Sequence, residues 1–204
     1  MMQTTVLFDL DGVLIDSHAA FTASVNHALA EYGLTARGAD DLRRFIGPPL
    51  RGTFADLGVA RDDIDGRVDS YRDHYGAHGA AVTTVFEGIP EMLEAIRARH
   101  RLVIATSKAA SLAAAIVCEL GLAPYFDALH GPADETLAEP KTQTVARALP
   151  AVALVGDTRY DVEAALANGL RPIGVTWGIG AEDDLRAAGA EAIAHAPHEL
   201  EGLL

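Results

Sequence analysis

Val6-Leu7-Phe8-Asp9-Leu10-Asp11-Gly12 is the stretch from which the fold and the chemistry of this chain can be argued. An apolar run typical of a buried strand ends there in two acids, and residues two apart on a strand point to the same side. Two buried carboxylates repel each other unless a cation or a shared proton relieves them. A divalent metal, an acid–base role for one acid, or both would provide that relief.

Two other interpretations of this stretch were weighed. A calcium loop requires an acid at its fifth position, glycine at its sixth and glutamate at its twelfth, whereas this chain has Val13 at the fifth, Gly12 already at the fourth and Ala20 at the twelfth. The sequence therefore excludes it. A solvated turn without chemistry stays open on the motif alone.

Composition narrows the possible functions. Half of the 204 residues are hydrophobic, which is enough for a sizeable core, and the net charge of −13 argues against binding to nucleic acid or to anionic membranes. The single Cys118 rules out an internal disulfide, and we expect it to be buried in a helix. No basic-plus-apolar leader precedes Asp9 and no apolar run reaches 18 residues, so we expect a soluble, cytoplasmic protein.

Strand-like and helix-like segments alternate along most of the chain, which predicts a parallel sheet with helices on both faces. After a first strand over Thr4–Phe8, residues 16–82 show only helical periodicity and predict a small helical bundle inserted into the chain. The first of its helices is expected to begin after Ser17 and to end at Gly33. Further strands are expected over residues 102–106, 152–155, 172–176 and 191–194, and helices over 90–100, 111–121, 140–149, 160–168 and 182–188.

Ligands bind beyond the carboxyl ends of the strands in open parallel sheets. Besides the aspartate pair, polar side chains follow predicted strands or open the next helix: Thr106, Ser107, Lys108, Lys141, Asp157 and Asp161. Taken singly, the hydroxyls and Asp157 are more simply helix caps, and Lys141 is more simply a surface charge. Their coincidence at one edge of one sheet favours a site.

The residue types fit phosphoryl transfer to a carboxylate. An aspartate can attack phosphorus when charge on the phosphoryl oxygens is neutralised, and a lysine and a threonine hydroxyl can supply donors to those oxygens. Mg²⁺ suits a pocket lined by carboxylates. A second acid, Asp11, can protonate the leaving oxygen and later activate water.

On these residues the chain resembles the haloacid dehalogenase-like hydrolases. The resemblance covers residues 8–17, 105–108, 141 and 156–161 in order, and residues 46–50 and 174–178 resemble the phosphoglycolate phosphatase-like branch. It implies an α/β fold, with a Rossmann-like, doubly wound parallel-sheet core formed by residues 1–15 and 83–204. It also implies that residues 16–82 form a small α-helical cap domain.

The resemblance further implies a phosphatase that hydrolyses a small phosphomonoester, either phosphoglycolate-like or a nucleoside monophosphate, through an aspartyl-phosphate. Asp9 would be the nucleophile, Asp11 the acid–base residue, and Thr106, Ser107 and Lys141 would bind the phosphoryl group. Mg²⁺ would be held by Asp9, Asp11 through its backbone carbonyl, Asp157 and Asp161, the last directly or through water. Many members have proline directly after the lysine, whereas Thr142 follows here, so Lys108 is the alternative to Lys141.

The same family suggests other functions. Asp11 argues against carbon–halogen cleavage, and the absence of lysine before Lys108 argues against phosphonate cleavage through a cap lysine. A sugar phosphomutase is the alternative enzyme, and a catalytically silent binding or regulatory relative is the alternative outside enzymes. In the cap, Arg51 and Arg43 or Arg44 are candidates for binding a substrate carboxylate or second phosphate, and a solvated charge on a helix is the equally open alternative for each. His74 and His78 are four apart on a helix, and we expect an exposed polar face there rather than a metal site. The sequence gives no oligomeric state.

Overall fold

The computed structural model describes residues 3–133 and 139–204 of the chain. It divides into two compact units, the first formed by Met1–Ile15 and Val85–Leu204 and the second by Asp16–Thr84. Each unit is described separately. Within the described ranges, no helix is both long and apolar enough to cross a membrane.

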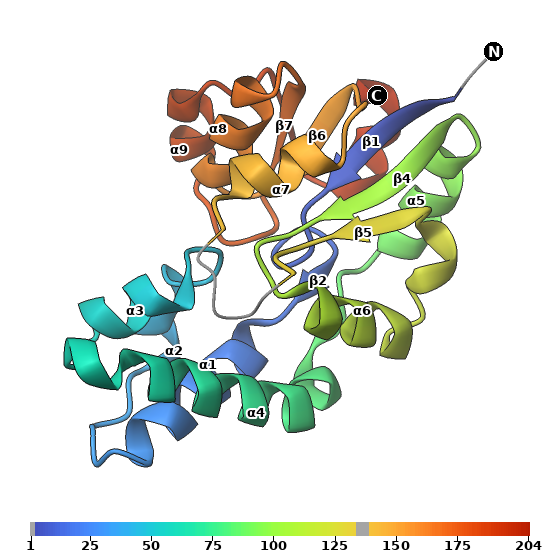
Figure 1. Ribbon diagram of the computed structural model, residues 1–204. Helices are drawn as coiled ribbons and strands as arrows, with labels where there is room; N and C mark the ends of the chain where they lie inside the picture. Colours follow the sequence, from blue (N-terminus) through green and yellow to red (C-terminus); the bar gives the residue numbers. More distant parts are fainter. Residues whose placement is uncertain (1–2, 134–138) are drawn as a thin grey trace. The chain divides into compact units, whose positions relative to one another are not determined.

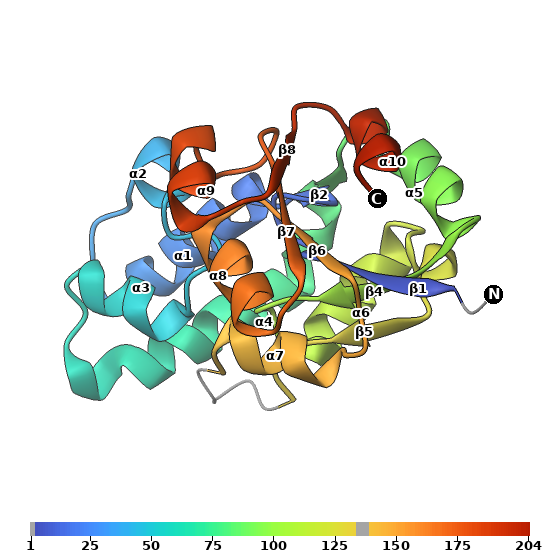
Figure 2. The same ribbon diagram turned by 90° about the horizontal axis from the view of Figure 1, so that it is seen from above.

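A six-stranded parallel sheet forms the centre of the first unit (Figure 1). Its strands are β1 (Thr4–Phe8), β4 (His100–Ala105), β5 (Ala128–His130), β6 (Ala153–Gly156), β7 (Arg171–Val175) and β8 (Ala192–Ala194). The order across the sheet is β5-β4-β1-β6-β7-β8, and Figure 2 shows the same strands from above. The expected α/β, Rossmann-like parallel sheet is confirmed.

Helices cover both faces of this sheet because the side chains of each strand alternate between faces. On one face Leu7, Val103 and Leu154 form a core with Val145 of α7 (Lys141–Arg147) and Ala164 of α8 (Arg159–Ala167). The intervening residues of the strands, which point to the opposite face, are also fully buried, and α5 (Ile89–Arg97) contacts β4 there. The remaining helices of the unit are α6 (Ala110–Glu119), α9 (Glu182–Ala188) and α10 (Leu200–Leu203), with short 3₁₀ turns at Ala123–Tyr125 and Pro197–Glu199.

The register of the sheet aligns the ends of its three central strands. Phe8 of β1 pairs with Ile104 of β4 on one side and with Val155 of β6 on the other. The chain therefore leaves all three strands at the same edge, and the polar residues that follow them are brought together by topology rather than by proximity in sequence.

The second unit is helical. It contains α1 (His18–Ala30), α2 (Ala39–Arg43), α3 (Leu50–Asp56), a 3₁₀ turn at Arg61–Asp63 and α4 (Ile64–Val82). Its core lies between α1 and α4, where the rings of Phe21 and Tyr71 meet edge to face at 5.7 Å. The two segments that connect the units, β2 (Ile15–Asp16) and β3 (Thr84–Val85), pair as a two-stranded sheet.

Some local expectations were wrong. The sequence analysis contained no strand at β5, which has only three residues, all half-buried, at the edge of the sheet. The first helix ends at Ala30 rather than Gly33, and Ser17 makes no side-chain cap. The backbone of Ser17, at φ −104° and ψ 8°, lies outside the extended region typical of an N-cap residue, and Asp16 accepts a hydrogen bond from the His18 N–H at 3.0 Å. Cys118 is exposed rather than buried, since α6 turns Ala113, Ile116 and Val117 inward instead.

Candidate active site

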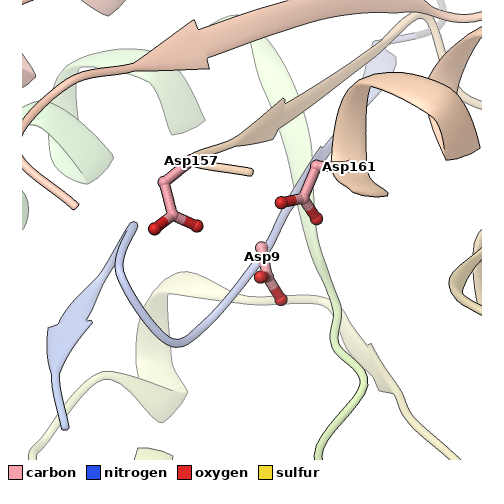
Figure 3. Close-up of side chains that lie close together, drawn as sticks. All are labelled: Asp9, Asp157 and Asp161. Carbon is pink, nitrogen blue, oxygen red and sulfur yellow. The ribbon is translucent and has the colours of Figure 1, made fainter. Parts of the chain in front are cut away.

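Three aspartates of the first unit come together beyond the ends of the central strands (Figure 3). Asp9 directly follows β1, Asp157 directly follows β6, and Asp161 lies in the first turn of α8. One oxygen from each carboxylate lies within 4.8 Å of the others, and the three residues are 7%, 0% and 2% exposed. The close-up shows the three side chains close together, at the ends of segments that are far apart in the sequence. This convergence of acids is buried rather than solvated.

Lys141 is the cation of this group. It is the first residue of α7, directly after Pro140, and is 8% exposed. Its ammonium lies 2.5 Å from Asp9 Oδ1 and 2.9 Å from Asp161 Oδ1. Burial by itself lowers the pKa of Lys141, but the carboxylates of Asp161 and Asp9 outweigh it and raise that pKa above the usual value for lysine. Lys141 therefore stays charged and joins two of the three acids.

The charges within the cluster do not balance. The carboxylates of Asp9, Asp157 and Asp161 carry three negative charges when ionised, and Lys141 supplies one positive charge. Burial raises the pKa of Asp9 to about 7, with Lys141 opposing the shift and Asp161 adding to it. Burial also raises the pKa of Asp157 well above its usual value, and Asp161 and Asp9 add to that shift. Two positive charges are missing from the site.

The donor set fits a divalent cation of the Mg²⁺ type. Such ions bind oxygen ligands, mostly carboxylates and water. Asp157 Oδ1 is fully buried and has no hydrogen-bond partner in the described part of the chain, so one ligand atom is free for an ion. Other oxygens of the cluster have partners: Asp157 Oδ2 accepts from the Ile179 N–H at 2.8 Å, and Asp161 Oδ2 accepts from the N–H and hydroxyl of Thr158 at 3.1 and 2.7 Å.

The second acid of the opening motif has its own partner. Lys108 Nζ lies 2.7 Å from Asp11 Oδ1, and both side chains are almost buried, at 11% and 13% exposed. The backbone N–H of Lys108 donates to Thr106 Oγ1 at 3.1 Å, and Thr106 itself is buried directly beyond β4. Ser107 is half-buried beside them. This pair is neutral as a whole and leaves the imbalance at the three aspartates unchanged.

The structure therefore brings together the predicted residues of the core in two linked sets. One contains Asp9, Asp157, Asp161 and Lys141, and the other contains Asp11, Lys108 and Thr106. Of the two lysines left open by the sequence, Lys141 contacts the acid cluster and Lys108 contacts Asp11. Both are thus part of the site.

The cap arginines belong to the second unit, and their part in substrate binding stays a prediction. Arg51 forms an ion pair with Asp65, and Arg43 is the exposed last residue of α2. The histidine pair gains a third member that the sequence analysis missed: His27 of α1 stacks on His74 at 4.4 Å, and His74 contacts His78 at 4.9 Å. Their nitrogens do not form a ligand set, because in the described residues the aspartates are the one group that converges on a possible metal position.

Sequence reasoning also missed the backbone that holds Asp157. The donor is the amide of Ile179, in a loop after β7 whose glycines had been used only to suggest the branch of the family. The repeated glycine of Gly178-Ile179-Gly180 after a buried strand is the one signal that pointed to a close backbone approach.

A model of the haloacid dehalogenase-like hydrolase family matches residues 6–175, which include the four aspartates, both lysines and Thr106. The chain belongs to the haloacid dehalogenase-like hydrolases. A family member named 5'-nucleotidase from Pseudomonas aeruginosa is 36% identical over 89% of this chain and 86% of its own length. A member named tyrosine-protein kinase PtkA from Mycobacterium tuberculosis is 32% identical over 94% of this chain and 68% of its own.

Solved structures of haloacid dehalogenase-like proteins agree with this assignment. A predicted phosphatase from Clostridium acetobutylicum superposes with a TM-score of 0.92 at 33% identity, over 100% of this chain and 98% of its own. A phosphoglycolate phosphatase also occurs among the relatives. The expectations of this family, its phosphoglycolate phosphatase-like branch and an enzyme of the phosphoric monoester hydrolase class are confirmed.

Proposed function

We propose that this protein is a Mg²⁺-dependent phosphatase that hydrolyses a small phosphorylated metabolite through an aspartyl-phosphate on Asp9. The observation that carries the proposal is the charge imbalance at the end of the central strands. Three buried carboxylates are accompanied by one ammonium, which contacts only two of them, and Oδ1 of Asp157 has no hydrogen-bond partner among the described residues. A divalent cation corrects both.

Asp9, Asp157 and the backbone carbonyl of Asp11 would hold the Mg²⁺, with Asp161 acting directly or through water. When bound, the ion neutralises negative charge on Asp9 and on the phosphoryl oxygens. Lys141 adds a second positive charge beside the nucleophile, 2.5 Å from Asp9 Oδ1. The pKa of Asp9 is about 7 with Lys141 already lowering it, so the charge of the ion would keep Asp9 ionised and able to attack.

The reaction then has two halves. In the first, which requires Asp11 to have taken up a proton, an oxygen of Asp9 attacks phosphorus, the bond to the leaving oxygen breaks, and Asp11 gives its proton to that oxygen and becomes a carboxylate. In the second, Asp11 takes a proton from a water molecule that attacks the aspartyl-phosphate, which releases inorganic phosphate and regenerates Asp9. Thr106 and Ser107 donate to the phosphoryl oxygens, and Lys108 holds Asp11 in place through their 2.7 Å ion pair.

For the substrate we propose a phosphoglycolate-like compound or a nucleoside monophosphate, handled in the cytoplasm. The names of two relatives, a phosphoglycolate phosphatase and a 5'-nucleotidase, support these two classes. The second unit would act as the cap, and Arg51 and Arg43 are its candidate anion-binding residues. Phosphate release from a panel of phosphorylated metabolites distinguishes the two substrate classes. The same panel, measured on Arg51→Met and Arg43→Met, tests whether these arginines bind the substrate.

Release of phosphate from p-nitrophenyl phosphate tests the proposal. The wild type should be active with Mg²⁺ and inactive in EDTA, and Asp9→Asn should lower turnover at least about a thousandfold while the circular dichroism spectrum stays unchanged. Asp183→Asn, the same change at an exposed position of α9, is the matched control and should keep full activity. Wild-type turnover in Asp9→Asn would refute the assignment of the nucleophile.

The same preparation distinguishes the alternatives. A sugar phosphomutase would convert a hexose 1-phosphate into its isomer faster than it releases phosphate, and a silent relative would do neither. We expect phosphate release to dominate on every substrate that turns over. Predominant isomer formation would replace the proposal with the mutase.

A further inference from the structure

The loop after β7, residues 176–180, carries no proposed catalytic group, yet it touches two parts of the site. The backbone N–H of Ile179 donates to Asp157 Oδ2 at 2.8 Å. The indole Nε1–H of Trp177 donates at 3.0 Å to the carbonyl oxygen of Val13, two residues beyond Asp11. This clamp loop therefore joins the acid after β6 to the turn after β1.

Two glycines of the clamp loop are required by close approach. A Cβ atom on Gly178 would lie 2.6 Å from the Cβ of Asp157 and would also meet the carbonyl oxygen of Gly12. A Cβ atom on Gly180 would overlap the carbonyl oxygen of Asp157. Neither glycine has a positive φ, so a side chain at these positions meets no backbone strain. The contact with Asp157 is therefore the reason for glycine here.

We propose that Gly178 and Ile179 are positioning residues that orient the carboxylate of Asp157 for a divalent cation. The Ile179 amide ties down Oδ2, and the close contact of Gly178 prevents the side chain from turning away. Oδ1, which is buried and unpartnered in the described residues, is thereby left facing the other aspartates. The inference rests on the proposed Mg²⁺ site and adds to it the element that prepares one ligand before the ion arrives.

Loss of the contact between the clamp loop and Asp157 should weaken Mg²⁺ binding strongly and change the rate of the chemical step only slightly. Partners that orient a metal ligand typically change metal affinity by about 10–100-fold when they are mutated. Gly178→Ala presses on the side chain of Asp157 and on the carbonyl of Gly12, and its Cβ meets no atom of Asp9 or Lys141 among its nearest contacts. We therefore expect the Mg²⁺ concentration for half-maximal activity to rise about 10–100-fold, while kcat at saturating Mg²⁺ stays within about threefold of the wild type.

The experiment measures Mg²⁺ binding directly and by activation. Metal-free wild type, Gly178→Ala and Gly202→Ala are titrated with MgCl₂, and the dissociation constant is obtained from the rise in melting temperature. Activation of p-nitrophenyl phosphate hydrolysis is followed in parallel. Gly202 lies in α10 of the same unit with open space around its Cβ position, so Gly202→Ala is the matched control and should bind like the wild type.

The outcomes separate this inference from the proposed function. A wild type that binds no Mg²⁺ contradicts the proposed function and the inference with it. A wild type that binds Mg²⁺ while Gly178→Ala binds it equally well contradicts the inference alone, and so does a loss of melting temperature without a loss of affinity. If Gly178→Ala does not fold, Trp177→Phe keeps an aromatic side chain but removes the indole N–H that holds the clamp loop to the Val13 carbonyl, and an affinity within twofold of the wild type then overturns the inference.

Discussion

Asp9 should destabilise the metal-free protein, and Asp9→Asn should therefore stabilise it. Burial raises the pKa of Asp9 from 3.8 to about 7. Between these two pH values the folded state holds a proton that the unfolded state has released, so the stability of the wild type falls as the pH rises through this window. Asparagine is neutral at every pH and removes this penalty.

The size of the effect follows from the shift. A difference of about three pKa units at about 1.4 kcal/mol per unit gives roughly 4 kcal/mol above pH 7, as an upper limit. Because Asp9 is only 7% exposed, solvent screens little of it. For a chain of this length, 1 kcal/mol moves the melting temperature by about 2–4 °C, so Asp9→Asn should melt up to roughly 8–16 °C higher at pH 8 in EDTA.

The assay is thermal and urea denaturation of the wild type, Asp9→Asn and the control Asp183→Asn at pH 4.5, 6 and 8 in EDTA. The gain in Asp9→Asn should be largest at pH 8, shrink toward pH 4.5 and shrink also on adding Mg²⁺ to both proteins. Asp183→Asn should track the wild type throughout. An Asp9→Asn protein that is less stable than the wild type at pH 8 in EDTA would refute the account of buried, uncompensated charge.

Three further predictions concern single cations and the second unit. Lys141→Met leaves buried carboxylates without their ammonium and should lower the free energy of unfolding, measured in urea, by about 3–5 kcal/mol. Arg97→Met removes an exposed ion pair and should lower it by less than about 1 kcal/mol. Equal losses in the two variants would contradict the argument from burial. Lys108→Met should lower kcat for phosphate release about 10–100-fold because Asp11 loses its partner, and an unchanged kcat would remove that ion pair from the mechanism. Burial and two neighbouring imidazoles lower the pKa of His74, so the second unit should lose stability as the pH falls below 6.5. Amide hydrogen exchange in α4 at pH 5.5 and 7.5 measures this loss, which His74→Gln should reduce; the same pH response in both proteins would show that another group is responsible.

The sequence predicted the sheet and the convergence of its acids because both depend on local patterns. An apolar run followed at once by Asp9 or Asp157 marks the end of a buried strand, and parallel topology places such ends at one edge. The short edge strand β5 was not predicted, because three half-buried residues are too few to show an alternating hydrophobic pattern. Cys118 was misplaced because its helix is apolar on most sides, so the sequence does not indicate which face is buried.

The details of the site depend on tertiary structure and could not be predicted. The motif spacing left open which of Lys108 and Lys141 enters the acid cluster, because the answer depends on how α7 packs against the sheet. The donor to Asp157 is a backbone amide, and backbone amides leave no signature in side-chain identity. The pairing of Asp11 with Lys108 likewise joins residues 97 positions apart.

The paired connecting segments β2 and β3 have a consequence for how such proteins diversify. Because Ile15–Asp16 and Thr84–Val85 lie side by side, the polypeptide leaves the first unit and re-enters it at adjacent points. Whatever is spliced between those points, long or short, leaves the strand order undisturbed. Evolution, or a protein engineer, can therefore exchange the whole insert as a cassette and keep the reaction centre intact.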